Sequence, residues 1–165
     1  MRFHLQQIFR APADDVARAY TDPALYERLG RLPKLGRPEM LERREDGDVV
    51  HLQVRYRFTG DLSAAVRRVV DPDRLTWVEH ATHHLARREV DFRLVPDHYG
   101  DKLRSFGRYR FEEAEDGLTR RVAEGDVSVR VPIVGGAVER AIVSGLREHL
   151  AQETGLVERF LADGG

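Results

Sequence analysis

Apolar and polar residues alternate with a period of two through much of the first 130 positions, a pattern typical of half-buried β-strands. The clearest alternation places five apolar side chains on one face of a strand: Val50, Leu52, Val54, Tyr56 and Phe58. Further extended segments are predicted at 1–11, 37–44, 62–70, 75–79, 90–96, 103–111 and 118–131. We therefore predict about six to eight strands, each with one dry face.

Turn signals between these segments indicate that consecutive strands pair as hairpins. Asp46-Gly47 and Asp116-Gly117 are dipeptides that hairpin turns favour, and Asp71-Pro72-Asp73 also predicts a turn. Gly125 lies inside the last strand, where we expect a β-bulge. The segment 80–88 fits either a short helix or a loop. Sequential hairpins predict an antiparallel sheet whose dry face must be covered.

Helical patterns appear near both ends of the chain. Pro12 opens one short helix, and Asp22-Pro23 supplies an N-cap and a first-turn proline for a second. The longest candidate lies within 131–162 and would measure about 40 Å if unbroken. Before it, Pro132 ends the last strand and Gly135-Gly136 permit a sharp turn. Only this helix is long enough to cover the sheet.

The order of elements is thus strand, two helices, a run of strands and one long helix, in a single domain of residues 1–165. Over almost its whole length the chain resembles the START/SRPBCC helix-grip superfamily, which includes birch-pollen-allergen relatives, polyketide cyclases and lipid-transfer domains. The resemblance rests on this order, on Pro12 and Asp22-Pro23, on DPDRLTW between middle strands, and on VPIVGGAVE before the last helix. The segment RVPIVGGAVERAIVSGLREHL is similar to a branch described only as a domain of unknown function.

The resemblance implies an α+β fold in which a curved antiparallel sheet wraps around the C-terminal helix. It also implies a hydrophobic cavity between sheet and helix, which binds lipids, polyketides or other apolar ligands. We expect the cavity wall to include Val54, Tyr56, Phe58, Trp77, Phe92, Ser105, Tyr109, Val129, Ile142, Leu146, His149 and Glu153.

Two polar residues interrupt the face of the long helix that should meet the sheet, namely His149 and Glu153. A buried carboxylate costs several kcal/mol unless it is paired or neutral, so Glu153 is the most informative position. One interpretation makes it a polar anchor or a general acid/base, with His149 as the second catalytic candidate. The other places Glu153 at the cavity mouth or in a structural pair with an arginine.

Other site chemistries fit the sequence less well. The histidines at 80, 83, 84 and 98 match no established zinc spacing, and the chain has no cysteine to complete a metal site. No serine lies in a GxSxG motif. Gly135-Gly136 belong to no phosphate-binding motif, and Glu139 in the following turn would repel an anion. We therefore expect no metal and no cofactor.

Charge and composition exclude some partners. The 27 basic and 28 acidic residues leave a net charge of −1, which gives no electrostatic case for nucleic-acid binding. The N-terminal segment lacks the apolar core of a signal peptide, and no apolar run reaches about 18 residues. We expect a cytoplasmic monomer or homodimer without integral membrane association. Arginines should line the solvated outer face of the sheet: Arg55, Arg57, Arg104, Arg108, Arg110 and Arg130.

Three functions stay open from the sequence. The first is storage, transport or sensing of a hydrophobic small molecule or lipid, which we favour because no nucleophile or metal motif is present. The second is a polyketide cyclase or dehydratase-like enzyme, in which Glu153, His149 or a cavity tyrosine moves protons. The third is a protein-interaction module that uses the arginine face, without a ligand.

Overall fold

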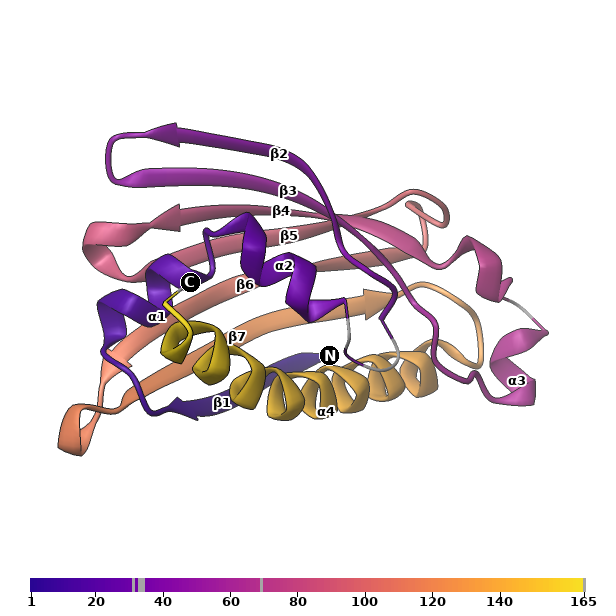
Figure 1. Cartoon of the computed structure of the whole chain (residues 1–165). Helices are drawn as coiled ribbons and strands as arrows, with labels where there is room; N and C mark the ends of the chain where they lie inside the picture. The colour runs from indigo at the N-terminus through magenta and orange to yellow at the C-terminus, as the bar shows by residue number, and fades with distance from the viewer. Residues whose placement is uncertain (31, 33–34, 69, 165) are drawn as a thin grey trace.

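A computed structural model describes residues 1–30, 32, 35–68 and 70–164, and its core is one antiparallel sheet of seven strands. The strands are β1 (Arg2–Phe9), β2 (Glu39–Asp46), β3 (Val49–Arg57), β4 (Thr76–His84), β5 (Glu89–Pro96), β6 (Leu103–Glu113) and β7 (Thr119–Val129). The helices are α1 (Ala13–Ala19), α2 (Pro23–Leu29), α3 (Ala64–Arg67) and α4 (Gly135–Ala162), with 3₁₀ turns at Pro72–Arg74, Leu85–Arg87 and Glu115–Gly117. The predicted α+β fold and element order are confirmed (Figure 1).

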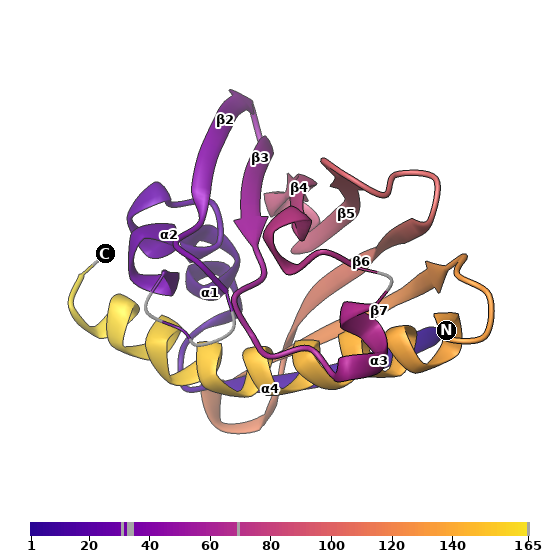
Figure 2. The ribbon, with the colours of Figure 1, turned by 90° about the vertical axis from the view of Figure 1, so that its right-hand side faces the viewer.

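The strand order across the sheet is β1-β7-β6-β5-β4-β3-β2. From β7 to β2 every neighbouring pair consists of strands that are consecutive in the chain, and β1 closes the other edge by pairing with β7. Helix α4 runs along the concave side of the curved sheet and packs mainly on β1 and β7 (Figures 1 and 2). We call the side of the sheet that meets α4 the inner face.

The two N-terminal helices begin as their sequences predict. Pro12 precedes α1, whose first turn carries Asp14 and Asp15. Asp22 caps α2 by accepting a hydrogen bond from the Ala24 backbone N–H, and Pro23 occupies the first turn. Figure 2 places α1 and α2 beside the C-terminal half of α4, and α3 beside its N-terminal half. The two ends of α4 therefore have different surroundings.

Two segments differ from the sequence-based expectation. The strand predicted at 62–70 is wrong, because Ser63 caps the short helix α3 by accepting from the Val66 N–H. The ambiguous segment 80–88 is extended as far as His84, where pairing with β3 and β5 continues β4, and only then makes a 3₁₀ turn. Pairing with strands that are distant in the sequence makes residues 80–84 extended, and a local sequence pattern carries no information about such pairing.

The glycines of the last strand and the last turn serve close packing. Gly125 makes no bulge, since the pairing of β7 with β1 and β6 is continuous; it lies opposite Gly107, where the two backbones approach closely. The sharp turn before α4 uses Ile133, whose φ is 70°, in place of Gly135-Gly136. Gly135 is needed because a Cβ there would lie 2.5 Å from the Val129 carbonyl oxygen.

Candidate functional site

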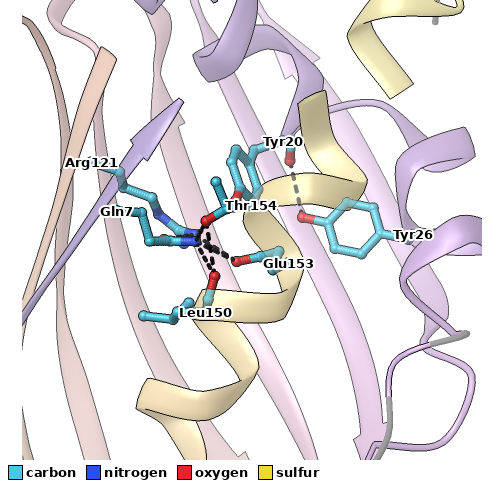
Figure 3. A network of polar contacts seen from close by, with 7 residues as sticks. All are labelled: Gln7, Tyr20, Tyr26, Arg121, Leu150, Glu153 and Thr154. Atoms are coloured by element: carbon cyan, nitrogen blue, oxygen red, sulfur yellow. Dashed lines mark hydrogen bonds and ion pairs between the residues drawn. The ribbon is translucent and has the colours of Figure 1, made fainter. Parts of the chain in front are cut away.

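A buried ion pair joins β7, next to the β1 edge of the sheet, to α4. The Nη1 of Arg121, on β7, donates to Glu153 Oε2 at 3.1 Å, to Gln7 Oε1 at 3.1 Å and to the Tyr20 hydroxyl at 2.9 Å (Figure 3). Arg121 and Glu153 are each only 5% exposed. Their mutual attraction and shared hydrogen bonds offset the cost of burying both charges.

Gln7 links the same pair to the helix backbone. Its Nε2 donates to the Leu150 carbonyl oxygen at 2.7 Å and to Thr154 Oγ1 at 3.1 Å, and lies 3.3 Å from Glu153 Oε2 (Figure 3). Gln7 lies on the buried face of β1, together with Phe3, Leu5 and Phe9. Gln7 therefore fixes the position of α4 on β1 through three polar contacts.

Aromatic rings surround the Arg121 guanidinium where it makes no hydrogen bonds. Its carbon lies 4.1 Å from the ring centroid of Tyr109, 4.3 Å from Tyr20 and 5.8 Å from Phe111. Arg121 Nε has no hydrogen-bond partner among the described residues. Cation–π contact is stronger for such desolvated cations than at the surface. The guanidinium is thus enclosed by the protein on most sides.

These contacts show the surroundings of the two helix residues that were singled out from the sequence. Glu153 is paired with an arginine, which was the structural alternative for that position. His149 is partly exposed, and burial lowers the pKa of its imidazole, so it is neutral at pH 7. Its Nδ1 has no hydrogen-bond partner among the described residues. Sequence reasoning missed Arg121, although it shares the strand face of Val127 and Val129.

A second carboxylate, Glu79 on β4, also lies on the inner face, paired in register with Val54 of β3 and Leu94 of β5. It makes no hydrogen bond or ion pair with any described residue. Burial raises the pKa of its carboxyl to about 7, while Arg121 opposes the shift and Glu153 adds to it. Glu79 therefore changes charge near neutral pH. The alternation of side chains along a strand predicts that Glu79 shares a face with Trp77. No sequence motif identified Glu79 as a functional residue.

The Glu79 carboxyl should make the stability of the fold depend on pH. Its pKa is raised from 4.5 to about 7 in the native state, so the native state holds the proton more tightly than the unfolded chain. The contribution of Glu79 to stability is therefore fully present below pH 4.5 and is lost as the pH rises to about 7. Glu79→Gln removes this loss, and we expect it to be about 2 kcal/mol more stable than the parent at pH 8.5.

Urea unfolding at pH 4.5 and pH 8.5 measures the effect. At the lower pH the parent and Glu79→Gln should have similar free energies of unfolding. Glu115→Gln, a change at an exposed turn residue, is the matched control and should follow the parent at both pH values. Equal pH dependence of Glu79→Gln and the parent would contradict the raised pKa.

The structure places the predicted wall residues of β3 to β7 on the inner face. Tyr56 and Trp77 are cross-strand neighbours whose rings stack at 5.9 Å, and Phe92 stacks on Tyr109 at 4.6 Å. Val54, Ser105 and Val129 have the same orientation in their strands. Phe58 lies just beyond β3 and bridges to Leu35. The predicted helix residues Ile142 and Leu146 lie on the same side of α4 as Glu153.

The inner face divides into two halves that differ in burial. Around α1, α2 and the C-terminal half of α4 the side chains are buried, including Phe9, Val16, Leu25, Leu52, Val157 and Phe160. We call this the closed half. Around the N-terminal half of α4 Val127 and Val143 are buried, but seven apolar or aromatic side chains stay partly exposed: Tyr56, Trp77, Leu94, Leu103, Val138, Ile142 and Leu146. We call these residues the open half.

No set of three or more metal-ligating side chains occurs in the part of the chain that the structure describes. The β4 histidines lie on different faces, since His83 is on the inner face with Val50 as its partner, whereas His84 lies 3.5 Å from Asp91. Burial lowers the pKa of His83 to about 3, so it is a neutral core residue.

The outer face carries the predicted arginines, and carboxylates accompany several of them. Arg55 lies 3.4 Å from Asp97, Arg108 2.8 Å from Asp91, and Arg110 3.5 Å from both Glu112 and Glu124. This pairing dilutes any positive field that would attract an acidic partner. Surface depressions at α2 and around the exposed Phe106 are open to solvent and adjoin neither Glu79 nor Arg121.

None of the described helices has the length and apolar character needed to cross a membrane. The family model described as "Protein of unknown function (DUF2505)" matches residues 4–161. No curated protein matches the chain significantly.

Several solved structures share the fold. TTHA0849 from Thermus thermophilus superposes with a TM-score of 0.70 at 19% identity, with both chains covered over 100% of their length. The Zhui aromatase/cyclase from Streptomyces sp. R1128 gives 0.63 at 17% identity, covering 96% of this chain and 91% of the other. A START superfamily protein from Mycobacterium smegmatis gives 0.59 at 19% identity, covering 96% and 98%. The chain therefore belongs to the DUF2505 family of proteins of unknown function, and its fold is that of the START/SRPBCC helix-grip superfamily.

Proposed function

We propose that the protein binds a hydrophobic small molecule or lipid between the inner face of the sheet and the N-terminal half of α4. The observation that carries the proposal is the contrast between the two halves of the inner face. On α4, Ile142 and Leu146 remain partly exposed, although they lie on the side that meets the sheet, whereas Leu156 and Phe160 are buried.

The exposed surface of the open half is apolar and aromatic. Leaving such surface in water costs about 25 cal/mol for each Å², so a ligand that covers it gains that free energy on binding. The stacked rings of Tyr56 and Trp77 offer a flat wall, and Leu94 and Leu103 extend it towards the first residues of β6. Polar groups are few, which is the usual composition of a small-molecule site: they include Glu79 on β4, Ser105 on β6 and Glu139, which accepts a hydrogen bond from the Val129 N–H.

An uncharged fluorescent probe tests this proposal. Nile red should bind saturably with one equivalent per chain and accept energy from Trp77, the only tryptophan. Ile142→Trp fills the open half and should weaken binding at least about tenfold, because overpacking a filled site costs about 1–3 kcal/mol. Ser144→Trp, on the exposed side of the same helix, is the matched control and should bind as the parent does.

Native mass spectrometry of the protein purified from bacteria supplies an independent measurement, since a bound apolar molecule would appear as added mass. Absence of Nile red binding, or equal affinity of Ile142→Trp and the parent, would reject the open half as a binding site.

A second candidate function is proton-transfer catalysis on such a molecule, as in a cyclase or dehydratase. The observation that favours it is the pKa of about 7 at Glu79, since a general acid or base works best with a pKa near the working pH. In this candidate Glu79 takes the role first considered for Glu153, which is held in its ion pair with Arg121. Turnover of polyketide substrates that survives Glu79→Gln would remove this role.

A further inference from the structure

We propose that the ligand carries a protonated amine at one end of an apolar body, and that Glu79 binds this amine at the inner end of the open half. The inference rests on the proposed binding function and specifies its ligand.

The charged cluster around Arg121 holds two carboxylates, Glu79 and Glu153, and one cation. Arg121 and Glu153 neutralise each other at 3.1 Å, and Glu79 has no ion-pair partner in the described part of the chain. The two histidines near this cluster add no charge, because burial lowers the pKa of both His83 and His149. A bound cation would balance Glu79, whereas a bound anion would add a second uncompensated charge.

Arg121 is committed to protein partners through its charge and its Nη1, although its Nε–H donates to none of the described residues. Its Nη1 already donates to three protein oxygens, its guanidinium contacts the rings of Tyr20, Tyr109 and Phe111, and its residue is 5% exposed. A carboxylate or phosphate entering the open half would therefore meet Glu79 without gaining a free cation. Repulsion between the Glu79 carboxylate and a negatively charged ligand therefore disfavours the binding of anions in the open half.

The surroundings of Glu79 favour an organic cation in particular. Its cross-strand neighbours are the apolar Val54 and Leu94, so a charge pair formed there is poorly screened by water. Glu79 helps to raise the pKa of the Tyr56 and Tyr109 phenols, so both lie within reach of its charge, and no described residue hydrogen-bonds to their hydroxyls. Free hydroxyl oxygens suit an ammonium group, because they can accept hydrogen bonds from its N–H groups.

Three probes with the same apolar body separate the polar ends: 4-phenylbutylamine, 4-phenylbutanol and 4-phenylbutanoate. Their affinities at pH 7.5 are measured by Trp77 fluorescence and by displacement of Nile red. The amine should bind at least about tenfold more tightly than the alcohol, as expected for a hydrogen bond to a charged group, and the acid most weakly.

Glu79→Gln keeps the shape and removes the charge, so it should abolish the preference for the amine and leave the alcohol's affinity within about twofold. Glu115→Gln, at the exposed turn before β7, should retain the preference. The inference is overturned if the alcohol or the acid binds as tightly as the amine, if none of the three displaces bound Nile red, or if Glu79→Gln keeps the preference. In each of these cases Nile red binding still supports the proposed function, whereas a protein that binds no Nile red loses both.

Discussion

Replacing Arg121 with methionine should lower the free energy of unfolding by about 3–5 kcal/mol, because the change leaves Glu153 buried without its counter-ion. Gln7 and Tyr20 would each lose a hydrogen bond at the same time, and the rings of Tyr20 and Tyr109 would lose the cation between them. Urea unfolding followed by far-UV circular dichroism measures the loss.

The neighbouring Arg120 provides the matched control for this prediction. It lies on the outer face of β7, exposed and 3.9 Å from Glu112, so Arg120→Met should cost less than about 1 kcal/mol. The double variant Arg121→Met with Glu153→Leu removes both buried charges and should recover most of the loss. Equal stability of Arg121→Met and Arg120→Met would show that the buried pair is not what stabilises this junction.

Gly107→Ala should destabilise the fold by about 3 kcal/mol, at the upper end of the usual cost of overpacking. A Cβ at this position would lie 2.2 Å from the Glu124 carbonyl oxygen and 2.8 Å from the Gly125 Cα. Both atoms belong to the backbone of β7, which is paired on its two sides with β6 and β1 and has little room to move.

Gly145→Ala is the opposite case in the same protein. No described atom would lie within 4 Å of its Cβ, and alanine has the higher helix propensity, so this variant should gain up to about 1 kcal/mol. Thermal melts of the two variants give the comparison. If Gly107→Ala melts no lower than Gly145→Ala, the close approach of β6 and β7 does not require glycine.

The sequence determined the elements whose causes are local. Alternation within 49–58 predicts β3 because side chains of a strand point to opposite faces in turn. Asp22 and Pro23 predict the start of α2 because the cap and the proline act on the first turn alone. The order of these elements along the chain was then sufficient to predict an antiparallel sheet covered by the C-terminal helix. The failures at 62–70 and at Gly125 came where a side-chain cap or a neighbouring backbone decided the outcome.

The tertiary structure alone decided the composition of the candidate site. Glu153 could be marked from sequence as a carboxylate on an apolar helix face, but its partner Arg121 comes from β7, and its further contact Gln7 from β1. Glu79 carried no signal in its own strand. Its charge state depends on the burial around it and on Arg121 and Glu153, which strand pairing and the docking of α4 bring near. The pKa of a side chain depends on the groups that surround it in space, so the raised pKa of Glu79 could not be predicted from the residues next to it in the sequence.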